Sequence, residues 1–403
     1  MATQTVNSLK NDLLRYAVLN PDKVLAERCR RDLFTFMQAF WECVSTDVPH
    51  WNWHIRYLCD ELMEVAERVA RGELKTHDLI VNIPPGTTKT TICSVMFPVW
   101  CWTRWSWMRF ICGSYSAVLS LESAVKSRDI VLSERFKDWY PRLSVRQDKS
   151  AKSNFQLVVR DERGVERLGG NRYSTSVGGT VTGFHGHINI VDDPINPEEA
   201  TSHASIETAS RWMEQTLSTR KVDKNVTATV LIMQRLHQDD PTGRWLAKQM
   251  TTVRHICLPG ESRNYREQVR PVEKLLMYQD DLLDPVRLDW RALEELKAIL
   301  GQYGYAGQIG QNPVPPKGGM FQVDHFQVID NLPVPMNILN TVRYVDKAST
   351  REKGNLLRAG VGARTAAVKM SLLRSGKYVV HDCKMGRWAT DEREAILREL
   401  AEA

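Results

Sequence analysis

Apolar residues recur along the chain with two different periods, and the two periods alternate. A repeat of three and four residues, typical of an amphipathic helix, places Ile55, Leu58 and Leu62 on one face of residues 54–71. Short runs of consecutive apolar residues, typical of strands buried on both faces, lie between further helical segments. Such strands are predicted at 79–83, 109–113, 155–160, 188–191, 227–233 and 253–258, and helices at 90–102, 117–135 and 205–218. The alternation predicts an α/β fold with a mostly parallel sheet and ligands at the carboxyl ends of its strands.

The pattern changes after the last of these strands. Residues 263–335 are rich in charge, proline and glycine, as in Asn312-Pro-Val-Pro-Pro-Lys-Gly-Gly319, and are predicted to form a lid or linker. A second β-rich unit follows, with strands predicted at 342–346, 366–373 and 378–382 and a helix that starts at Asp391. The sequence therefore predicts four parts: an N-terminal helical region at 1–50, a main α/β domain at 51–262, the lid or linker at 263–335, and a small α/β domain at 336–403.

Composition narrows the class of protein. The 403 residues are 42% hydrophobic and 25% charged, which is enough for more than one globular core. The net charge of +6 permits a polyanionic partner without requiring one. Eight cysteines show no C-x-x-C pair and no metal-ligand spacing, and are expected to be reduced thiols. The longest apolar run, residues 92–102, is too short to span a bilayer, and no signal peptide is visible. A soluble intracellular protein is expected.

The first candidate for chemistry is Leu79-Ile-Val-Asn-Ile-Pro-Pro-Gly-Thr-Thr-Lys-Thr-Thr91, an apolar strand that leads into a glycine-containing turn. Backbone N–H groups of such a turn, and of the following helix, can bind phosphate oxygens. Lys89 would neutralise charge near the β and γ phosphates, and the Thr90 hydroxyl would bind Mg²⁺. The loop is irregular, since the usual pattern G-x-x-x-x-G-K-[ST] has its second glycine where Thr88 stands. Taken alone, it is equally compatible with an ordinary strand-to-helix turn. The predicted nucleotide-binding residues of the loop are Pro85, Gly86, Thr87, Thr88, Lys89, Thr90 and Thr91.

The second candidate is Ile188-Asn-Ile-Val-Asp-Asp-Pro194, in which a buried strand delivers two carboxylates to its end. Asp192 fits a carboxylate of the Mg²⁺ site, and Asp193 could polarise an attacking water. An Asp-Asp pair after an apolar run is also often a solvated strand end. The conjunction of both segments predicts a site for a nucleoside triphosphate, with ATP and Mg²⁺ as the cofactors.

The order of these and further motifs resembles the large terminase subunit of tailed bacteriophages, from about residue 35 to the end. The motifs that carry the resemblance, besides the two above, are Ser114-Tyr-Ser116 before a helix with Arg128, Gly178-Gly-Thr-Val-Thr-Gly183, Met233-Gln-Arg-Leu-His-Gln-Asp-Asp240, Gly318-Gly-Met-Phe321 and Arg343-Tyr-Val-Asp-Lys-Ala-Ser-Thr350. The resemblance implies an ASCE-type P-loop ATPase domain at 51–262, which pumps double-stranded DNA through a portal into a procapsid. It also implies an RNase H-like nuclease domain at 336–403, which cuts concatemeric DNA.

The resemblance further implies residue roles and partners. Thr90 and Asp192 would hold Mg²⁺, Asp346 would hold Mg²⁺ or Mn²⁺ in the nuclease domain, and Trp53 would contact adenine. The implied partners are double-stranded DNA, the portal protein, the small terminase subunit and further copies of this chain in a ring on the portal, in the host cytoplasm and with no membrane.

Departures from the family pattern leave alternatives open. Pro85 stands where many relatives carry an arginine, so the charge-stabilising arginine would come from elsewhere, with Arg128 and Arg235 as candidates. By resemblance, the nuclease carboxylates other than Asp346 lie beyond residue 403, so an incomplete and inactive nuclease domain is expected. One alternative is a superfamily 2-like helicase, although too few residues follow the linker for its second domain. The other is a non-catalytic scaffold that binds a nucleotide without hydrolysing it.

Overall fold

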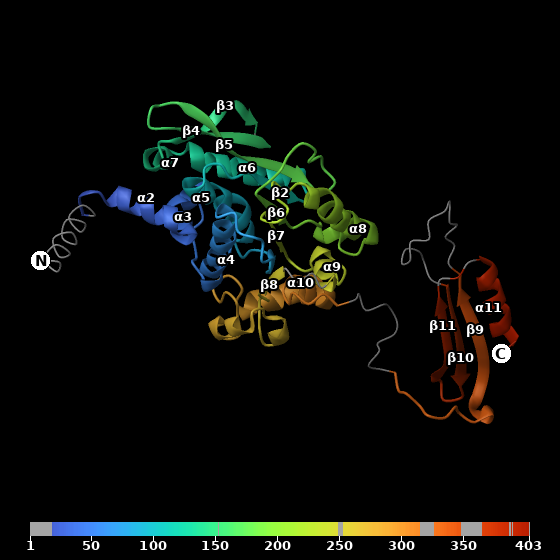
Figure 1. The fold of residues 1–403 in the computed structure, drawn as a ribbon. Coiled ribbons are helices and arrows are strands. Elements are labelled where there is room, and N and C mark those ends of the chain that lie inside the picture. The colour runs from blue at the N-terminus through green and yellow to red at the C-terminus, as the bar shows by residue number, and fades with distance from the viewer. Residues whose placement is uncertain are drawn as a thin grey trace, which may run out of the picture. The chain divides into compact units, whose positions relative to one another are not determined.

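The computed structural model describes residues 18–151, 153–248, 253–314, 326–347, 365–386, 388 and 390–402. The chain divides into two compact units, Met1–Gly318 and Gly319–Ala403. Figure 1 shows the elements of each unit. The predicted division into four parts stays a prediction, and residues 315–325 of the predicted linker lie outside the described residues.

The larger unit is built on an eight-stranded sheet in the order β3-β4-β5-β2-β6-β7-β1-β8. The strands are β1 (Asp78–Asn82), β2 (Phe110–Ser114), β3 (Leu143–Ala151), β4 (Asn154–Arg160), β5 (Glu166–Ser176), β6 (Ile188–Asp192), β7 (Ala228–Met233) and β8 (Val253–Cys257). Pairing is parallel from β5 through β8 in this order, and antiparallel between β3, β4 and β5. The predicted α/β fold with a mostly parallel sheet is confirmed, with an antiparallel edge that was not predicted.

The sheet separates two hydrophobic cores, which explains the continuous apolar runs of its strands. In β1, Leu79 and Val81 belong to the larger core, whereas Ile80, between them, belongs to a second core with Trp212 and Leu217. Successive side chains of a strand point to opposite faces, so both faces of β1 must be apolar. Figure 1 shows the corresponding layers, with α3 to α6 on one side of the sheet and α8 and α9 on the other.

Several helices of the larger unit are single elements in the structure. They are α2 (Pro21–Arg31), α3 (Leu33–Phe40), η1 (Trp41–Cys43), α4 (Trp53–Ala70), η3 (Pro197–Glu199), α9 (Pro241–Ala247), η6 (Arg266–Gln268), η7 (Val272–Met277) and α10 (Trp290–Gln308). The amphipathic helix predicted at 54–71 corresponds to α4, whose buried face includes Ile55, Leu58 and Leu62.

Three predicted helices are each divided into shorter elements. The segment predicted at 90–102 contains a π-helix, η2 (Thr91–Met96), followed by α5 (Phe97–Arg104). The segment at 117–135 forms α6 (Ala117–Leu132) and α7 (Glu134–Trp139). The segment at 205–218 forms α8 (His203–Arg211), a π-helix η4 (Trp212–Thr216) and the short η5 (Leu217–Thr219). Apolar periodicity cannot distinguish an α-helix from a π-helix, and Ser133 ends α6 because it is an extended residue that caps α7 through its hydroxyl.

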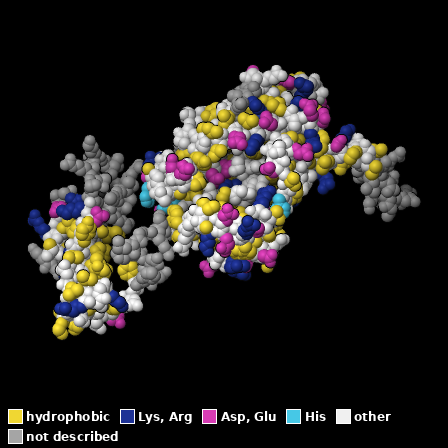
Figure 2. Space-filling view, turned by 180° about the vertical axis from the view of Figure 1, so that it is seen from behind, with side chains coloured by type: hydrophobic (Ala, Val, Ile, Leu, Met, Phe, Trp, Pro, Cys, Tyr) yellow, Lys and Arg dark blue, Asp and Glu magenta, His cyan; other side chains and the backbone are white. Residues whose placement is uncertain are grey.

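The smaller unit contains a three-stranded antiparallel sheet in the order β11-β10-β9. Its elements are η9 (Pro335–Asn337), β9 (Ile338–Asp346), β10 (Thr365–Leu373), β11 (Tyr378–Gly386) and α11 (Thr390–Glu402). They agree with the strands and helix predicted there. Figure 2 shows hydrophobic side chains gathered on this unit. The large hydrophobic residues that its strands expose include Tyr344, Tyr378 and Val380.

None of the helices in the described part of the chain is long and apolar enough to cross a bilayer.

Candidate functional site

The predicted phosphate loop connects β1 to η2 and turns through two residues with left-handed backbone. Gly86 has φ 76° and Thr88 has φ 69°. Glycine adopts this region without strain, whereas a β-branched residue such as threonine does so at a cost. The backbone of the loop therefore keeps the left-handed conformation at the position of the second glycine of the usual pattern, although a threonine stands there.

A series of hydrogen bonds and close polar contacts, from Thr87 through His54 to Asn52, holds the loop in place. The Thr87 hydroxyl, on a side chain that is buried, donates to the carbonyl oxygen of Pro84 at 2.7 Å. His54 Nε2 lies 3.1 Å from the carbonyl oxygen of Thr87, and the Asn52 amide lies 2.8 Å from His54 Nδ1. Burial lowers the pKa of His54 to about 4, so the imidazole is neutral at pH 7. A neutral ring that faces an amide N–H at Nδ1 and a carbonyl at Nε2 carries its proton on Nε2.

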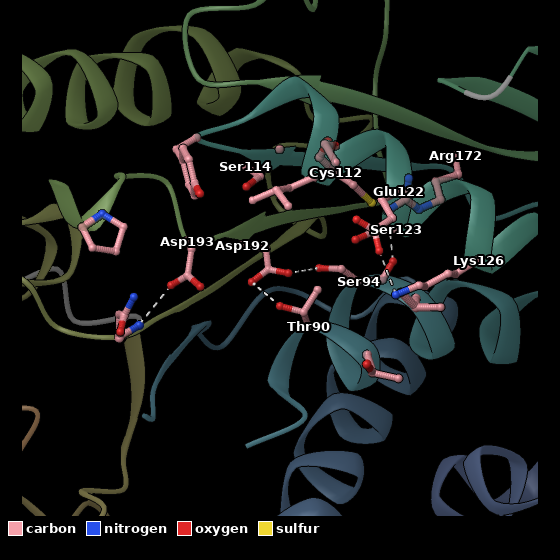
Figure 3. Close-up of a pocket in the computed structure, with 18 residues that line it drawn as sticks. Thr90, Ser94, Cys112, Ser114, Glu122, Ser123, Lys126, Arg172, Asp192 and Asp193 are labelled. Carbon is pink, nitrogen blue, oxygen red and sulfur yellow. Dashed lines mark hydrogen bonds and ion pairs between the residues drawn. The ribbon is translucent and has the colours of Figure 1, made fainter. Parts of the chain in front are cut away.

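Lys89 and Asp193 meet across the carboxyl ends of β1 and β6. Lys89 Nζ lies 3.1 Å from Asp193 Oδ2, and the side chains are 6% and 23% exposed. Thr90 and Asp192 meet in the same way, since the Thr90 hydroxyl donates to Asp192 Oδ1 at 3.2 Å. Figure 3 shows both carboxylates from the end of β6, with the Thr90 hydroxyl directed at Asp192. The structure thus brings together the four residues that the sequence analysis singled out on two segments far apart in the chain.

The electrostatics of the carboxylate pair favour a cation. The pKa of Asp192 is raised to about 6, first because its carboxyl group is buried and next because the charge of Asp193 is adjacent. A divalent cation would relieve both effects. Carboxylate and hydroxyl oxygens are the protein ligands that Mg²⁺ accepts, usually one or two carboxylates with water and phosphate completing the shell. Asp192 and Thr90 therefore fit the role of Mg²⁺ ligands.

The backbone of Asp193 fixes its carboxylate between three strand ends. Its φ is 42°, a region that aspartate tolerates better than most residues. Its N–H donates to the carbonyl of Ile232 at 2.8 Å, and its carbonyl accepts from the N–H of Tyr115 at 3.0 Å. Its Oδ1 accepts from the N–H of Gln234 at 3.1 Å. Asp193 is therefore held by β7 and by the residues that directly follow β2 and β7, so its carboxylate is positioned before any ligand binds.

Two residues that the sequence analysis missed position Asp192. The Ser94 hydroxyl, in the π-helix η2, donates to Asp192 Oδ2 at 2.7 Å. Arg172, a fully buried residue of β5, donates through Nη2 to the carbonyl of Ser94 at 3.0 Å and through Nη1 to the Ser174 hydroxyl. No sequence pattern marks either residue, because both act through contacts between segments distant in the chain.

A cavity of about 270 Å³ opens beside the two carboxylates. Its lining includes Ser114, Glu122, Ser123 and Lys126 from the β2–α6 region, in addition to Ser94 and Arg172 (Figure 3). Thr91 also lines it. Charged and hydroxyl side chains of the lining therefore lie next to the two carboxylates.

The two arginines predicted as candidates for charge stabilisation lie elsewhere. Arg235 donates from Nε to both carboxylate oxygens of the fully buried Asp240, at 3.1 and 2.9 Å, and is thereby committed to a structural ion pair. Arg128 lies on α6 and does not line the cavity. An arginine does contact the phosphate loop, although it is not a residue of the loop. It is Arg287, whose Nη1 donates to the Thr88 hydroxyl at 2.6 Å. It comes from the predicted lid or linker region, where no motif marked it.

Trp53 and Asp346 are not part of this cluster. Trp53 begins α4, and the centre of its ring lies 6.2 Å from that of His54 and 5.8 Å from that of Tyr278. It thus packs against His54, the residue that contacts the loop at Thr87. Its contact with adenine stays a prediction. Pro85 and Gly86 form the exposed tip of the loop.

Asp346 ends β9 in the smaller unit. Within the described residues, no group of three or more His, Cys, Asp or Glu side chains could hold a metal ion. The carboxylate of Asp382, on β11, pairs with Arg343 at 2.9 Å. The nuclease metal site at Asp346 therefore stays a prediction.

Comparison with known proteins gives structural neighbours only. No model of a known protein family matches the chain, and no curated protein sequence matches it. One similar solved structure is the large terminase of a thermophilic bacteriophage in complex with ADP, at 12% identity over 85% of this chain and 73% of that one, with a TM-score of 0.37. Another is the large terminase ATPase domain of a Thermus phage, at 13% identity over 68% of this chain and 98% of that one, with a TM-score of 0.40. A third is the HK97 bacteriophage large terminase, at 11% identity over 84% of this chain and 63% of that one, with a TM-score of 0.40. All three solved structures are of phage large terminases or their ATPase domain.

Proposed function

We propose that this chain is the ATP-hydrolysing subunit of a viral DNA-packaging motor. The observation that carries the proposal is the convergence of Lys89 and Thr90 on Asp193 and Asp192, at 3.1 and 3.2 Å, from two strands that are not neighbours in the sheet. An ordinary strand-to-helix turn and a solvated strand end would have no reason to meet in this way.

Each of the four residues has a distinct part in phosphoryl transfer to water. Lys89 neutralises phosphate charge, and it exchanges its present partner, Asp193, for the phosphates when ATP binds. Asp193 is then free to accept a hydrogen bond from the attacking water. Thr90 and Asp192 would hold Mg²⁺, which when bound supplies charge stabilisation at the phosphate oxygens. The low exposure of Lys89 strengthens its electrostatic effect, because little water screens it.

Translocation of double-stranded DNA, docking on a portal protein, association with a small terminase subunit and assembly into a ring are further parts of the proposal. Cleavage of concatemeric DNA belongs to the proposal only for a nuclease domain that supplies further metal ligands besides Asp346. These parts are supported by the order of motifs along the chain. The net charge of +6 is compatible with a polyanionic partner.

The test is ATP hydrolysis, measured as phosphate release with and without double-stranded DNA. We expect Lys89→Ala to reduce the rate by at least a hundredfold, since each 1.36 kcal/mol of lost stabilisation is about tenfold in rate. The matched control is Lys137→Ala, because Lys137 is an exposed lysine of α7 that pairs only locally, with Glu134 at 2.7 Å. Hydrolysis by Lys89→Ala at the parental rate would show that the site is wrongly assigned.

A nucleotide-binding scaffold without turnover is the second candidate function. The observation that favours it is the left-handed Thr88, with φ 69°, at a position where the usual loop has glycine. The same assay separates the two functions, since a scaffold would bind ATP and release no phosphate.

A further inference from the structure

Arg287 reaches the phosphate loop from a segment that lies far away in the sequence. Its Nη1 donates to the Thr88 hydroxyl at 2.6 Å, and its Nη2 lies 3.4 Å from the carbonyl oxygen of His50. The residue belongs to the stretch between η7 and α10, and its side chain is partly exposed. A guanidinium group is therefore placed at the rim of the loop.

The backbone that carries this side chain is fixed by a buried carboxylate. Asp284 is fully buried, and its Oδ1 accepts from the N–H groups of Val286 and Arg287, each at 3.2 Å. The same oxygen lies 3.4 Å from His50 Nε2, and the carbonyl of Asp284 accepts from the N–H of Leu288 at 2.8 Å. These hydrogen bonds hold the backbone of Arg287 in place. The guanidinium group itself is held by its contacts with Thr88 and His50.

The left-handed backbone of Thr88 costs free energy, and the hydrogen bond from Arg287 helps to offset that cost. A residue held in the left-handed region costs about 1–3 kcal/mol and persists only where its surroundings impose it. The bond from a charged donor to the Thr88 hydroxyl is of the stronger kind. A hydroxyl at this position thus serves to hold a guanidinium beside the loop, which glycine could not do.

The charge of the site calls for a second cation. Within the cluster of Lys89, Asp192 and Asp193, two carboxylates face one ammonium group, and that ammonium group is already paired with Asp193 at 3.1 Å. A bound triphosphate adds several negative charges. Arginine has five N–H donors in a rigid plane and stays protonated, so the Arg287 group can keep its contact with Thr88 and still donate to a phosphate oxygen.

We propose that Arg287 is a second phosphate-binding cation of this site, supplied in cis by the segment between η7 and α10. The proposal rests on the proposed ATP-binding function. It also gives that segment a part in nucleotide binding, since occupancy of the loop then stabilises the contact between Arg287 and the loop.

The test is the affinity for ATP in the presence of Mg²⁺, measured by titration calorimetry on the full chain. Arg287→Gln keeps donors for Thr88 but removes the charge, whereas Arg287→Lys keeps the charge. We expect Arg287→Gln to weaken ATP binding about tenfold, or about 1.4 kcal/mol, and Arg287→Lys to retain most of the affinity. Arg291→Gln, at an exposed arginine of the first turn of α10, is the matched control and should bind as the parent does.

A second background distinguishes charge from support of the loop. In Thr88→Gly the hydroxyl and the strain are both removed, so a purely supporting role of Arg287 disappears. We expect Arg287→Gln to weaken ATP binding about tenfold in this background as well. Parental affinity of Arg287→Gln, or loss of its effect in Thr88→Gly, would overturn the inference while leaving the ATPase proposal intact. A parent chain that neither binds nor hydrolyses ATP would overturn both.

Discussion

The hydrogen bond from Ser94 to Asp192 offers a quantitative test of the carboxylate site. The bond is 2.7 Å long, both residues are buried, and the acceptor is ionised at neutral pH when its raised pKa is about 6. Ser94→Ala removes only the hydroxyl and leaves that oxygen of Asp192 without its donor. Hydrogen bonds to charged groups contribute about 1.5–3 kcal/mol, so we expect the free energy of unfolding to fall by about 2 kcal/mol.

Ser120 provides the matched control for this substitution. Its hydroxyl is also buried and lines the same cavity, but it donates to the neutral carbonyl oxygen of Cys112 at 3.1 Å. Ser120→Ala should therefore cost only about 1 kcal/mol. Urea unfolding at pH 8 without nucleotide measures both variants. Followed by tryptophan fluorescence, it reports mainly on the larger unit, because all tryptophans except Trp388 lie there.

A double-mutant cycle measures how much of the cost of Ser94→Ala depends on the negative charge of Asp192. In an Asp192→Asn chain the acceptor is neutral, so Ser94→Ala should cost about 1 kcal/mol less than it does in the parent. The reasoning is refuted if Ser94→Ala costs no more than Ser120→Ala. It is equally refuted if Asp192→Asn leaves the cost of Ser94→Ala unchanged.

Three further predictions concern the aspartates, pH and the nuclease residue. Asp192→Asn should weaken Mg²⁺-dependent ATP binding and turnover together, whereas Asp193→Asn should stop turnover with binding nearly intact; equal loss of binding would contradict this division. Burial lowers the pKa of His54 and of His255 to about 4, below the unfolded value of about 6.5, so the unfolded chain binds protons first. Stability should therefore fall as pH drops from about 6.5 to about 4, and a thermal midpoint that stays constant over this range would contradict the assignment. Among the described residues Asp346 belongs to no group of three or more metal-binding side chains, so plasmid DNA with Mn²⁺ should show no Asp346-dependent cleavage by this chain, and cleavage that Asp346→Ala abolishes would mean that further metal ligands exist.

The sequence was sufficient to predict six of the eight strands of the large sheet and the residues that meet at its carboxyl edge. Continuous apolar runs predict strands buried on both faces, and the carboxyl ends of parallel strands share one edge of a sheet. Lys89 and Asp193 follow such runs, so their convergence could be anticipated without knowledge of the strand order. Thr90 and Asp192 were anticipated for the same reason.

The supporting residues could not be predicted, because their roles depend on tertiary packing. Arg287 contacts Thr88 across 199 positions of the chain, and Arg172 contacts Ser94 across 78. Neither arginine lies in a recognisable motif, and each would read as an ordinary surface or strand residue. Arg235 shows the converse, since a basic residue near the motifs is a reasonable candidate until the fold pairs it with Asp240.

Of the antiparallel edge, β4 was predicted, whereas β3 and β5 were not, and β5 was missed for a compositional reason. Residues 166–176 of β5 include two adjacent glycines and several polar side chains, which weaken the signal of a strand. Trp102 and the backbone of Met108 lie so close to Gly170 that a Cβ there would approach the carbonyl oxygen of Met108 to 1.8 Å. The glycine is thus required by packing that only the folded structure shows.

The position of β7 in the sheet has a consequence for synthesis of the chain on the ribosome. β7 lies between β1 and β6, although it follows both in the sequence, and β1 and β6 form no ladder with each other. A nascent chain that ends before Met233 thus contains both halves of the site but lacks the strand that joins them. The proposed ATP hydrolysis should therefore begin only after β7 has left the ribosomal exit tunnel, and fragments released earlier should be unable to consume ATP.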